Sequence, residues 1–476
     1  MNMNRRCQPI PRTEIDASCS VPLLSLLGGG LLWLLIGCIF ALIASLKFHA
    51  PHFLANDAHW TYGRIHAAHL TALLYGFALP SALGVGLWLL CRLGRMRLAG
   101  LAVIFIGAVL WNLSVAVGVA GILCGDGDGY ESFEMPRYVT ATLFVSYLLI
   151  ATCGVLTFHR RREDTLYPSQ WFVLGSLFWF PWIFSTASAL LLCHPARGVM
   201  QASIAWWFAN NLSYIVLGFT GLASIFYFVP KLLGRPLHST RLAIFAFWGL
   251  ALFGSLGGVP DGAPLPAWMV SLSMVGTVLT AIPVLAVILN LYQTARNDTR
   301  ALDTDTTLRF TYVALIFWLI ANVQRIVGVL PDVSGLTNYT WYPVAQWELF
   351  HCGFFAFAIF GAIYFIVPRL LNGSDDLPVW SPRLIQWHFG TMLAGVLISY
   401  LALLVAGIGQ GYFLGNPDYT FTQIMTGTLI PLRAGTTGDL LFIIGVIIFL
   451  LNFALLLRQC RHGRTEKAVA QRKERA

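Results

Sequence analysis

Residues 203–229 read SIAWWFANNLSYIVLGFTGLASIFYFV, a stretch without an acidic or basic side chain. A helix of roughly 20 mainly apolar residues crosses a bilayer core about 30 Å thick, so this stretch is long enough to span a membrane. Eleven other stretches meet the same requirement. The predicted spans are 22–46, 66–90, 98–122, 138–158, 170–193, 203–229, 242–257, 267–292, 310–330, 342–367, 384–408 and 438–457. The sequence therefore predicts an all-α, polytopic membrane protein with twelve transmembrane helices.

The composition of the 476 residues agrees with this fold class. Hydrophobic side chains make up 57% of the chain and charged side chains only 11%, whereas soluble domains contain about 25% charged residues. These proportions exclude a soluble enzyme and a disordered scaffold. The formal net charge of +9 would suit a nucleic-acid-binding protein, so the positions of the basic residues have to be considered.

The basic residues are distributed unequally between the two ends of the predicted spans. If both chain ends are cytoplasmic, 24 of the 30 Lys and Arg residues lie on that side and 6 lie on the other. Cytoplasmic loops carry such an excess, so the charge reflects membrane topology, and we expect lipid contact and no nucleic-acid partner. We expect a cytoplasmic N-terminus over 1–21, a membrane domain over 22–457 and a basic cytoplasmic tail over 458–476.

A repeated motif groups the spans in fours. The span 203–229 leads into YFVPKLLG at residues 227–234, and the span 342–367 leads into YFIVPRLL at residues 364–371. In both, a proline stops the apolar stretch and a cation follows, which suits a helix C-terminus. These two spans are four apart in chain order, so the repeat predicts three arcs of four helices.

Few ionisable side chains lie inside the predicted spans, and each is a functional candidate because burying such a group in a membrane is costly. The candidates are His66, His69, Glu348, His351, His388 and Asp439. His69 and His351 belong to spans that enter from the outer side, so we expect them at similar depth. Two facing imidazoles would suit the axial positions of a six-coordinate haem. The alternatives are an interfacial role for His66 and packing roles for the other histidines.

Further histidines lie in the predicted outer loops, at His49, His52, His59 and His194. Together with His66 and His69 they would form a copper-binding patch, an alternative to solvated loop histidines. The chain contains no HExxH, GxSxG or phosphate-binding motif, and no paired carboxylates that would indicate hydrolysis.

A series of motifs resembles subunit I of the cbb3-type (C-family) haem–copper oxidases. The motifs are RIHAAH at 64–69 with YGF at 75–77, WWFANN at 206–211, YFVPK at 227–231, RL at 241–242 with FW at 247–248, LPAW at 265–268, RLIQWHF at 383–389 and AGIGQG at 406–411. They follow the family's order over about residues 20–457. The resemblance implies the family's fold of twelve helices in three four-helix arcs.

The resemblance also implies that most metal ligands of the family are replaced. Of the family's six histidines, the low-spin haem ligand of the second helix is kept as His69. A copper ligand is replaced by Asn210, and the pair of copper ligands on the seventh helix falls near Gly258 and Val259. Asparagine, glycine and valine do not bind copper as imidazole does. The family's cross-linked tyrosine matches Trp318.

The tenth helix carries the last two family ligands, a His-x-His motif. By a gapless count these histidines become Gln346 and Glu348, and His351 lies one turn deeper. The glutamate next to the family's cross-linked tyrosine matches Gln324. We therefore expect no catalytic oxygen-reducing centre, and copper is not expected.

We expect a divergent cbb3-like subunit I of the bacterial inner membrane that transfers electrons in a respiratory complex. It would hold at most one low-spin haem b, through His69 and, as weaker candidates for the second ligand, His351 or Glu348. The resemblance implies c-type cytochrome subunits or donors as partners. One alternative is an active terminal oxidase or nitric oxide reductase with non-standard ligands. Another is a cofactor-free bundle that handles copper or small gases.

Overall fold

The computed structural model describes residues 10–296, 305–371 and 378–475, with side chains up to Arg461. These residues form helices and connecting loops, and no strand occurs among them. Eleven of the described helices are long and apolar enough to cross a membrane, and the apolar helix Thr240–Gly254 is shorter. Together they match the twelve predicted spans in order, so the predicted fold class is confirmed. Parts of the predicted segments 1–21 and 458–476 lie outside the described residues.

The helices follow one another in twelve crossings. The first four are α1 (Arg12–Leu46); α2, η3 and α3 (Tyr62–Thr71, Ala72–Ala78, Leu79–Gly94); α4 (Leu101–Cys124); and α5 (Arg137–His159). The next four are α6 and η4 (Pro168–Ala187, Ser188–Cys193); α7, η5 and α8 (Val199–Asn210, Asn211–Leu217, Gly218–Leu233); α9 and η6 (Thr240–Gly249, Leu250–Gly254); and α10 and α11 (Ala267–Leu279, Ala281–Ala295). The last four are α13 (Thr306–Gly328); α15, η7 and α16 (Trp341–Glu348, Leu349–Phe355, Ala356–Leu371); α17 (Pro382–Leu414); and α18 (Phe421–Arg475). The short helices η2 (Ala58–Trp60) and α14 (Pro331–Thr337) belong to loops.

Three of the crossings form the centre of the bundle, namely α2–α3, α7–α8 and α15–α16. In their most apolar windows 100%, 89% and 94% of the residues are buried, whereas the other candidate spans bury 50% or less. A surface helix buries one face and exposes the other, so these values separate central from peripheral helices. The central helices are the second, sixth and tenth crossings, which is the four-helix period of the predicted arcs.

Each central helix contains a π-helical segment, η3, η5 or η7. In each central helix a basic residue lies twenty residues after the first residue of the π-helical segment. These residues are Arg92 (after 72), Lys231 (after 211) and Arg369 (after 349). The repeat noticed in two spans therefore includes the second span as well. It was hidden there because Cys91 replaces the proline of the other two.

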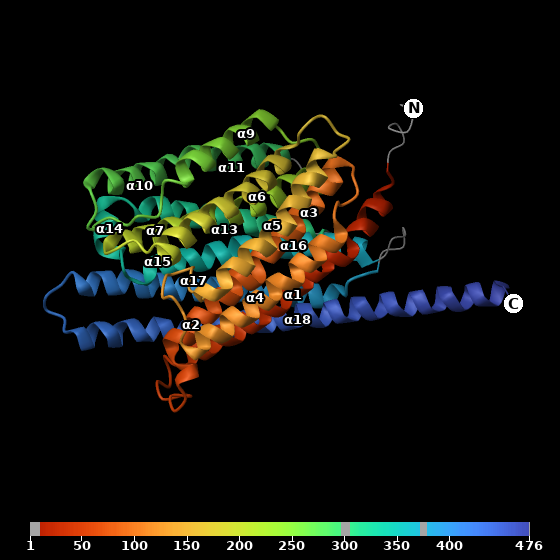
Figure 1. Cartoon of the computed structure of the whole chain (residues 1–476). Coiled ribbons are helices and arrows are strands. Elements are labelled where there is room, and N and C mark those ends of the chain that lie inside the picture. The colour runs from red at the N-terminus through yellow and green to blue at the C-terminus, as the bar shows by residue number, and fades with distance from the viewer. Residues whose placement is uncertain (1–9, 297–304, 372–377, 476) are drawn as a thin grey trace.

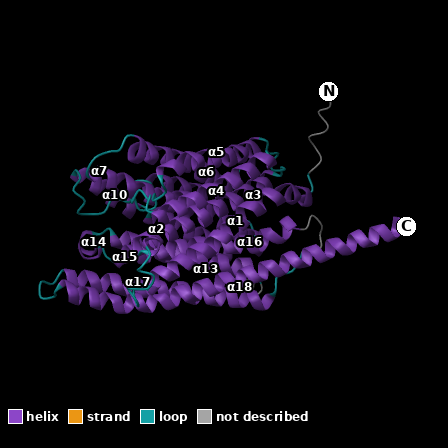
Figure 2. Cartoon of the chain, turned by 60° about the horizontal axis from the view of Figure 1, so that its bottom comes forward, coloured by secondary structure: helices purple, strands orange, loops and turns teal. Residues whose placement is uncertain are grey.

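α1 begins and α18 ends at the same end of the bundle, as an even number of crossings requires (Figures 1 and 2). At the opposite end α17 and α18 form a hairpin that extends beyond the neighbouring helices (Figure 1). α18 begins at Phe421, before the predicted span 438–457, so Asp439 lies inside the helix instead of at its opening. The polar residues before 438 lower the hydropathy, but they remain helical because they pack along α17.

A buried ion pair joins α1 to α3 near the end where α1 begins. Arg92 Nη1 lies 3.1 Å from Asp16 Oδ2, and the indole N–H of Trp88 donates to Asp16 Oδ1 at 3.0 Å. The Trp88 ring contacts the rings of Tyr227 and Phe365, with centroid distances of 5.6 and 5.9 Å. These three aromatic residues are equivalent in the repeat, so their contacts hold the central helices together at this end.

Candidate functional site

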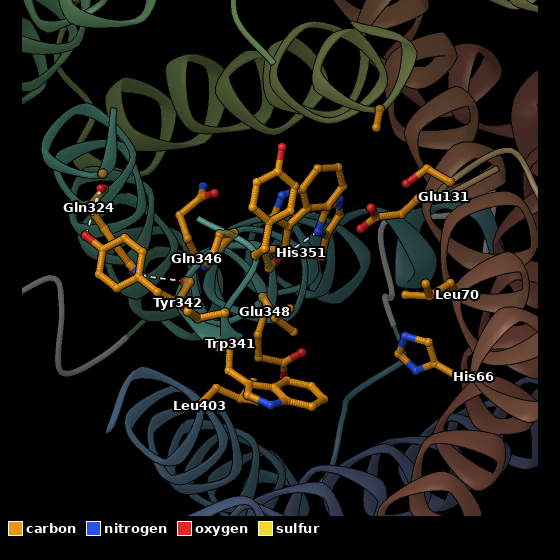
Figure 3. Close-up of a pocket in the computed structure, with 18 of the residues that line it drawn as sticks. His66, Leu70, Glu131, Gln324, Trp341, Tyr342, Gln346, Glu348, His351 and Leu403 are labelled. Atoms are coloured by element: carbon orange, nitrogen blue, oxygen red, sulfur yellow. Dashed lines mark hydrogen bonds between the residues drawn. The ribbon is translucent and has the colours of Figure 1, made fainter. Parts of the chain in front are cut away.

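A cavity of about 470 Å³ lies among the starts of the three central helices. Its volume is in the range of small-molecule sites, about 300–1,000 Å³. Five of the six candidate residues from the sequence line it, namely His66, His69, Glu348, His351 and Asp439. In Figure 3, His66 and Glu131 lie on one side, Gln324 and Tyr342 on the opposite side, and Glu348 and His351 between them. Residues of the second and tenth helices, His69 and His351 among them, thus line one cavity, as their predicted similar depth allows.

His69 lies on the last turn of α2, and its ring lines the cavity. Its Nδ1 lies 2.9 Å from the carbonyl oxygen of Gly37 on α1. A carbonyl oxygen only accepts hydrogen bonds, so Nδ1–H donates and the lone pair remains on Nε2. Metal-binding histidines are oriented in this way by a hydrogen bond from the other ring nitrogen. The hydrogen bond therefore leaves Nε2 as the nitrogen with the lone pair, the form in which an imidazole binds a metal.

His66 lies one turn before His69 and packs against its own helix. Its ring stacks on Tyr62 with a centroid distance of 5.5 Å and an interplanar angle of 7°. The centroid distance to the ring of His69 is 6.2 Å. His66 thus supports the wall of the cavity beside His69.

His351 lies in η7 and is buried. Its Nδ1 lies 2.8 Å from the carbonyl oxygen of Trp347, and its Nε2 lies 3.0 Å from Ser213 Oγ on η5. Nδ1–H therefore donates to the carbonyl, and Nε2 accepts from the serine hydroxyl. Both ring nitrogens are engaged, so His351 joins two central helices here, and Nε2 becomes available to a metal only if the hydroxyl turns away.

Asp439 lines the cavity and accepts a hydrogen bond from Ser399 Oγ of α17 at 3.2 Å. Close by, Ser45 Oγ of α1, which also lines the cavity, lies 2.7 Å from Thr436 Oγ1, and Thr436 Oγ1 lies 3.0 Å from Nε2 of the exposed His49. Hydrogen bonds thus tie α18 to α17 and to α1 at this side of the cavity.

The residues that the resemblance places at copper-ligand positions also lie together. Asn210, Gly258 and Val259 all line the cavity. The side-chain amide of Asn210 donates to the carbonyl oxygen of Gly254 at 2.9 Å, and the backbone N–H of Val259 donates to Ser273 Oγ at 3.0 Å. A Cβ atom on Gly258 would lie 2.7 Å from Asn210 Cβ, so a larger residue does not fit without a shift. This donor set does not fit a copper ion.

Arg325 is the residue of this site that the sequence analysis missed. Its Nη2 donates to Asn210 Oδ1 at 2.5 Å, and its guanidinium carbon lies 3.7 Å from the ring centroid of Tyr214. The guanidinium is also the nearest group to a Cβ atom placed on Gly257. A fixed cation therefore stands beside Asn210 and Gly257. The signal was present in the sequence, since Arg325 lies inside the predicted span 310–330.

Trp318, Gln324 and Gln346, three further positions that the resemblance singles out, take part in packing or in hydrogen bonds between helices. Trp318 is buried and packs against Phe354 at a centroid distance of 6.3 Å, and it does not line the cavity. Gln324 Nε2 donates to the carbonyl oxygen of Tyr342 at 3.1 Å. Gln346 donates to the hydroxyl of Tyr214. Both glutamines thus connect helices of the cavity wall.

The loop between α4 and α5 closes part of the cavity. Glu131 and Ser132 line the cavity, and the hydroxyl of Tyr75 donates to the carbonyl oxygen of Ser132 at 2.9 Å. Burial, together with the nearby charge of Glu131, raises the pKa of Glu134 to about 8. The loop therefore buries one carboxyl group, that of Glu134, and places the exposed Glu131 at the cavity.

The other histidines do not belong to the cavity lining. His388 is fully buried, and its Nδ1 lies 2.8 Å from the hydroxyl of Tyr364, so it packs between helices. Among the described residues no three His, Cys, Asp or Glu side chains come together as a metal site would require. The copper patch considered for the outer histidines has no such convergence in this part of the chain.

Comparison with known proteins matches the chain to one family over most of its length. A family described as cytochrome c and quinol oxidase polypeptide I matches residues 22–441. The cytochrome c oxidase subunit 1 homolog of Azorhizobium caulinodans is 27% identical over 443 residues, which cover 88% of this chain and 79% of that protein. A bacteroid homolog from Bradyrhizobium diazoefficiens is 26% identical over 453 residues, covering 90% and 80%. The cbb3-type cytochrome c oxidase subunit CcoN1 of Stutzerimonas stutzeri is 23% identical over 438 residues, covering 88% and 91%.

Proposed function

Because the chain belongs to the cytochrome c and quinol oxidase polypeptide I family, we propose that it is a divergent, cbb3-like electron-transfer subunit of a respiratory membrane complex. In this proposal it holds one low-spin haem b through His69 and has no haem–copper oxygen-reducing centre. The name of the CcoN1 relative supports the cbb3 assignment.

The orientation of His69 is the observation that carries the proposal. The hydrogen bond from Nδ1 to the carbonyl oxygen of Gly37, 2.9 Å long, fixes the tautomer in which Nε2 keeps its lone pair, and His69 lines the cavity. A haem bound there would accept and release one electron. Ala68, Leu73 and Leu74 are buried beside His69 and contribute apolar surface there.

In this proposal the second residue that would hold the haem comes from η7 or stands directly before it. His351 is the first candidate, since it lines the same cavity and needs only the loss of its 3.0 Å hydrogen bond from Ser213. Glu348 is the other candidate, and it stands directly before η7. A π-helical segment accommodates an extra residue within a helix. The gapless count that matched the family's two histidines to Gln346 and Glu348 runs through η7, and an extra residue there moves the match along the helix.

The charge of Arg325 supports the proposed absence of an oxygen-reducing centre, in addition to the poor copper donors Asn210, Gly258 and Val259. The Arg325 guanidinium is held beside Asn210 and Gly257. A divalent copper ion next to a fixed cation would be repelled at short range, where the low local dielectric strengthens the interaction. We also propose that the chain lies in the bacterial inner membrane with both ends cytoplasmic, and that its redox partners are c-type cytochromes.

The experiment is to count haem in the purified chain and in two histidine variants. Reduced-minus-oxidised spectra and a pyridine haemochrome assay should give one haem b per chain. His69→Ala should remove it, because the axial donor is lost. His52→Ala changes a histidine of the outer loop and should keep the full haem content. Haem retention in His69→Ala, or full loss in both variants, would contradict the assignment of His69.

A further inference from the structure

Arg325 is a cation inside the bundle, and within the described residues no carboxylate pairs with it. It lines the cavity, and the four ion pairs of this part of the chain do not include it. Its contacts are with neutral groups, the Asn210 amide oxygen at 2.5 Å from Nη2 and the ring of Tyr214, whose centroid lies 3.7 Å from the guanidinium carbon. Buried charges in proteins are normally paired with an opposite charge, so this arrangement is incomplete without a ligand.

The guanidinium is held in one orientation and has donors to spare. Asn210 Oδ1 accepts from Nη2, and the Asn210 amide is itself fixed by the carbonyl oxygen of Gly254. A guanidinium has five N–H donors in a planar fork that matches the two oxygens of a carboxylate. In the described part of the chain Asn210 is the one hydrogen-bond acceptor that it contacts. The remaining N–H groups are therefore available on the cavity side.

Other groups around Arg325 are suited to an anion. Tyr214 already accepts a hydrogen bond from Gln346, so its own O–H can donate to a ligand. Both residues line the cavity together with Arg325. Trp206 and Tyr342 also line the cavity. The guanidinium and the Tyr214 hydroxyl thus offer a cation and a hydroxyl donor in the same cavity.

We propose that Arg325 and Tyr214 form a binding site for a carboxylate group in the central cavity, at the position that matches the family's copper site. Asn210 positions the guanidinium and does not itself contact the ligand. The carboxylate has two sources, a propionate of a haem bound in the same cavity or a free small carboxylic acid. The second source is independent of the proposed haem, so the carboxylate site and the haem proposal can fail separately.

The first experiment uses formate as the probe on the purified, haem-free chain. Formate should raise the melting temperature in a saturable way, while chloride at the same ionic strength should not. Arg325→Gln should increase the half-saturating formate concentration by about 30-fold or more, as expected when one partner of a buried charge pair is truncated. Arg433→Gln, which changes an arginine hydrogen-bonded to the Phe48 carbonyl on the surface, should respond like the wild type.

The second experiment distinguishes the haem propionate. Haemin and its dimethyl ester are added to the haem-free chain and to Arg325→Gln, and retained haem is measured. If a propionate is the ligand, the wild type should prefer haemin to the ester, and the variant should lose that preference. If a free carboxylate is the ligand, the formate effect should depend on Arg325 and the haemin preference should not.

A third measurement needs no variant and covers the case in which Arg325→Gln does not fold. Phenylglyoxal modifies accessible arginines, and peptide mass spectrometry reports the modification of Arg325. Formate or haemin should protect Arg325 but not Arg433. No formate shift, no haemin preference and no protection would together overturn the proposal.

Discussion

Replacing Glu134 by glutamine should make the stability of the protein less dependent on pH. Glu134 belongs to the loop that closes the cavity, its side chain is buried, and Thr71 Oγ1 donates to its Oε2 at 3.5 Å. Burial raises its pKa from 4.5 to about 8. The folded protein thus holds a proton on Glu134 in a pH range in which the unfolded chain has released it.

The direction and size of the pH effect on stability follow from this difference in the pKa of Glu134. Stability rises with pH only where the unfolded state binds more protons, and here the folded state binds more. The contribution of Glu134 is therefore fully present below about pH 4.5 and is lost as the pH rises to about 8. One pKa unit corresponds to about 1.36 kcal/mol, so the loss over this range is on the order of 5 kcal/mol.

The assay is thermal unfolding of the purified protein and of Glu134→Gln at a series of pH values between about 5 and 8. The melting temperature of the wild type should fall relative to the variant as the pH rises, because glutamine does not ionise. Glu163→Gln, in an exposed pair with Arg95 at 3.1 Å, should show no such divergence. Parallel curves for wild type and Glu134→Gln would refute the account of the closed loop.

Three further predictions concern packing and the haem ligands. Asp16→Asn should destabilise the protein by about 3–5 kcal/mol, because it leaves Arg92 buried without its carboxylate, while Glu14→Gln in the exposed pair with Arg97 should have little effect on the melting temperature. Gly407→Ala should destabilise the protein by about 1–3 kcal/mol or more, because the added Cβ would meet the backbone of Tyr342. A Cβ on Gly409 would meet nothing within 4 Å, so Gly409→Ala should leave the melting temperature unchanged. Ser213→Ala removes the hydroxyl bonded to His351 Nε2 and should increase the low-spin fraction in electron paramagnetic resonance spectra if His351 is the second ligand; an unchanged spectrum would favour Glu348.

The helices and their grouping could be predicted because they depend on apolar length and on a local motif. A helix in a bilayer satisfies its own backbone hydrogen bonds, so a sufficiently apolar stretch implies a crossing. The start of α18 could not be found in this way, since helical residues before Asp439 are polar and are held by α17. The membership of the second span in the repeat was also hidden, because Cys91 removed the proline.

The candidate site could be predicted only in part. The spans of His69 and His351 indicated a shared depth, and the cavity contains both residues. Their hydrogen-bond partners, Gly37 and Ser213, come from distant segments of the chain, so no local sequence pattern predicts these contacts. Arg325 lies near the outer end of the predicted span 310–330 and belongs to the six basic residues of the outer side, although a cation inside a span was itself a signal.

The central claim is that the cavity holds one low-spin haem and no oxygen-reducing pair of metals. The most direct test is to measure iron, copper and the carbon monoxide difference spectrum on the same purified sample. The account predicts one haem iron per chain, no copper and no spectral change with carbon monoxide. A haem that reacts with carbon monoxide, together with stoichiometric copper, would contradict it.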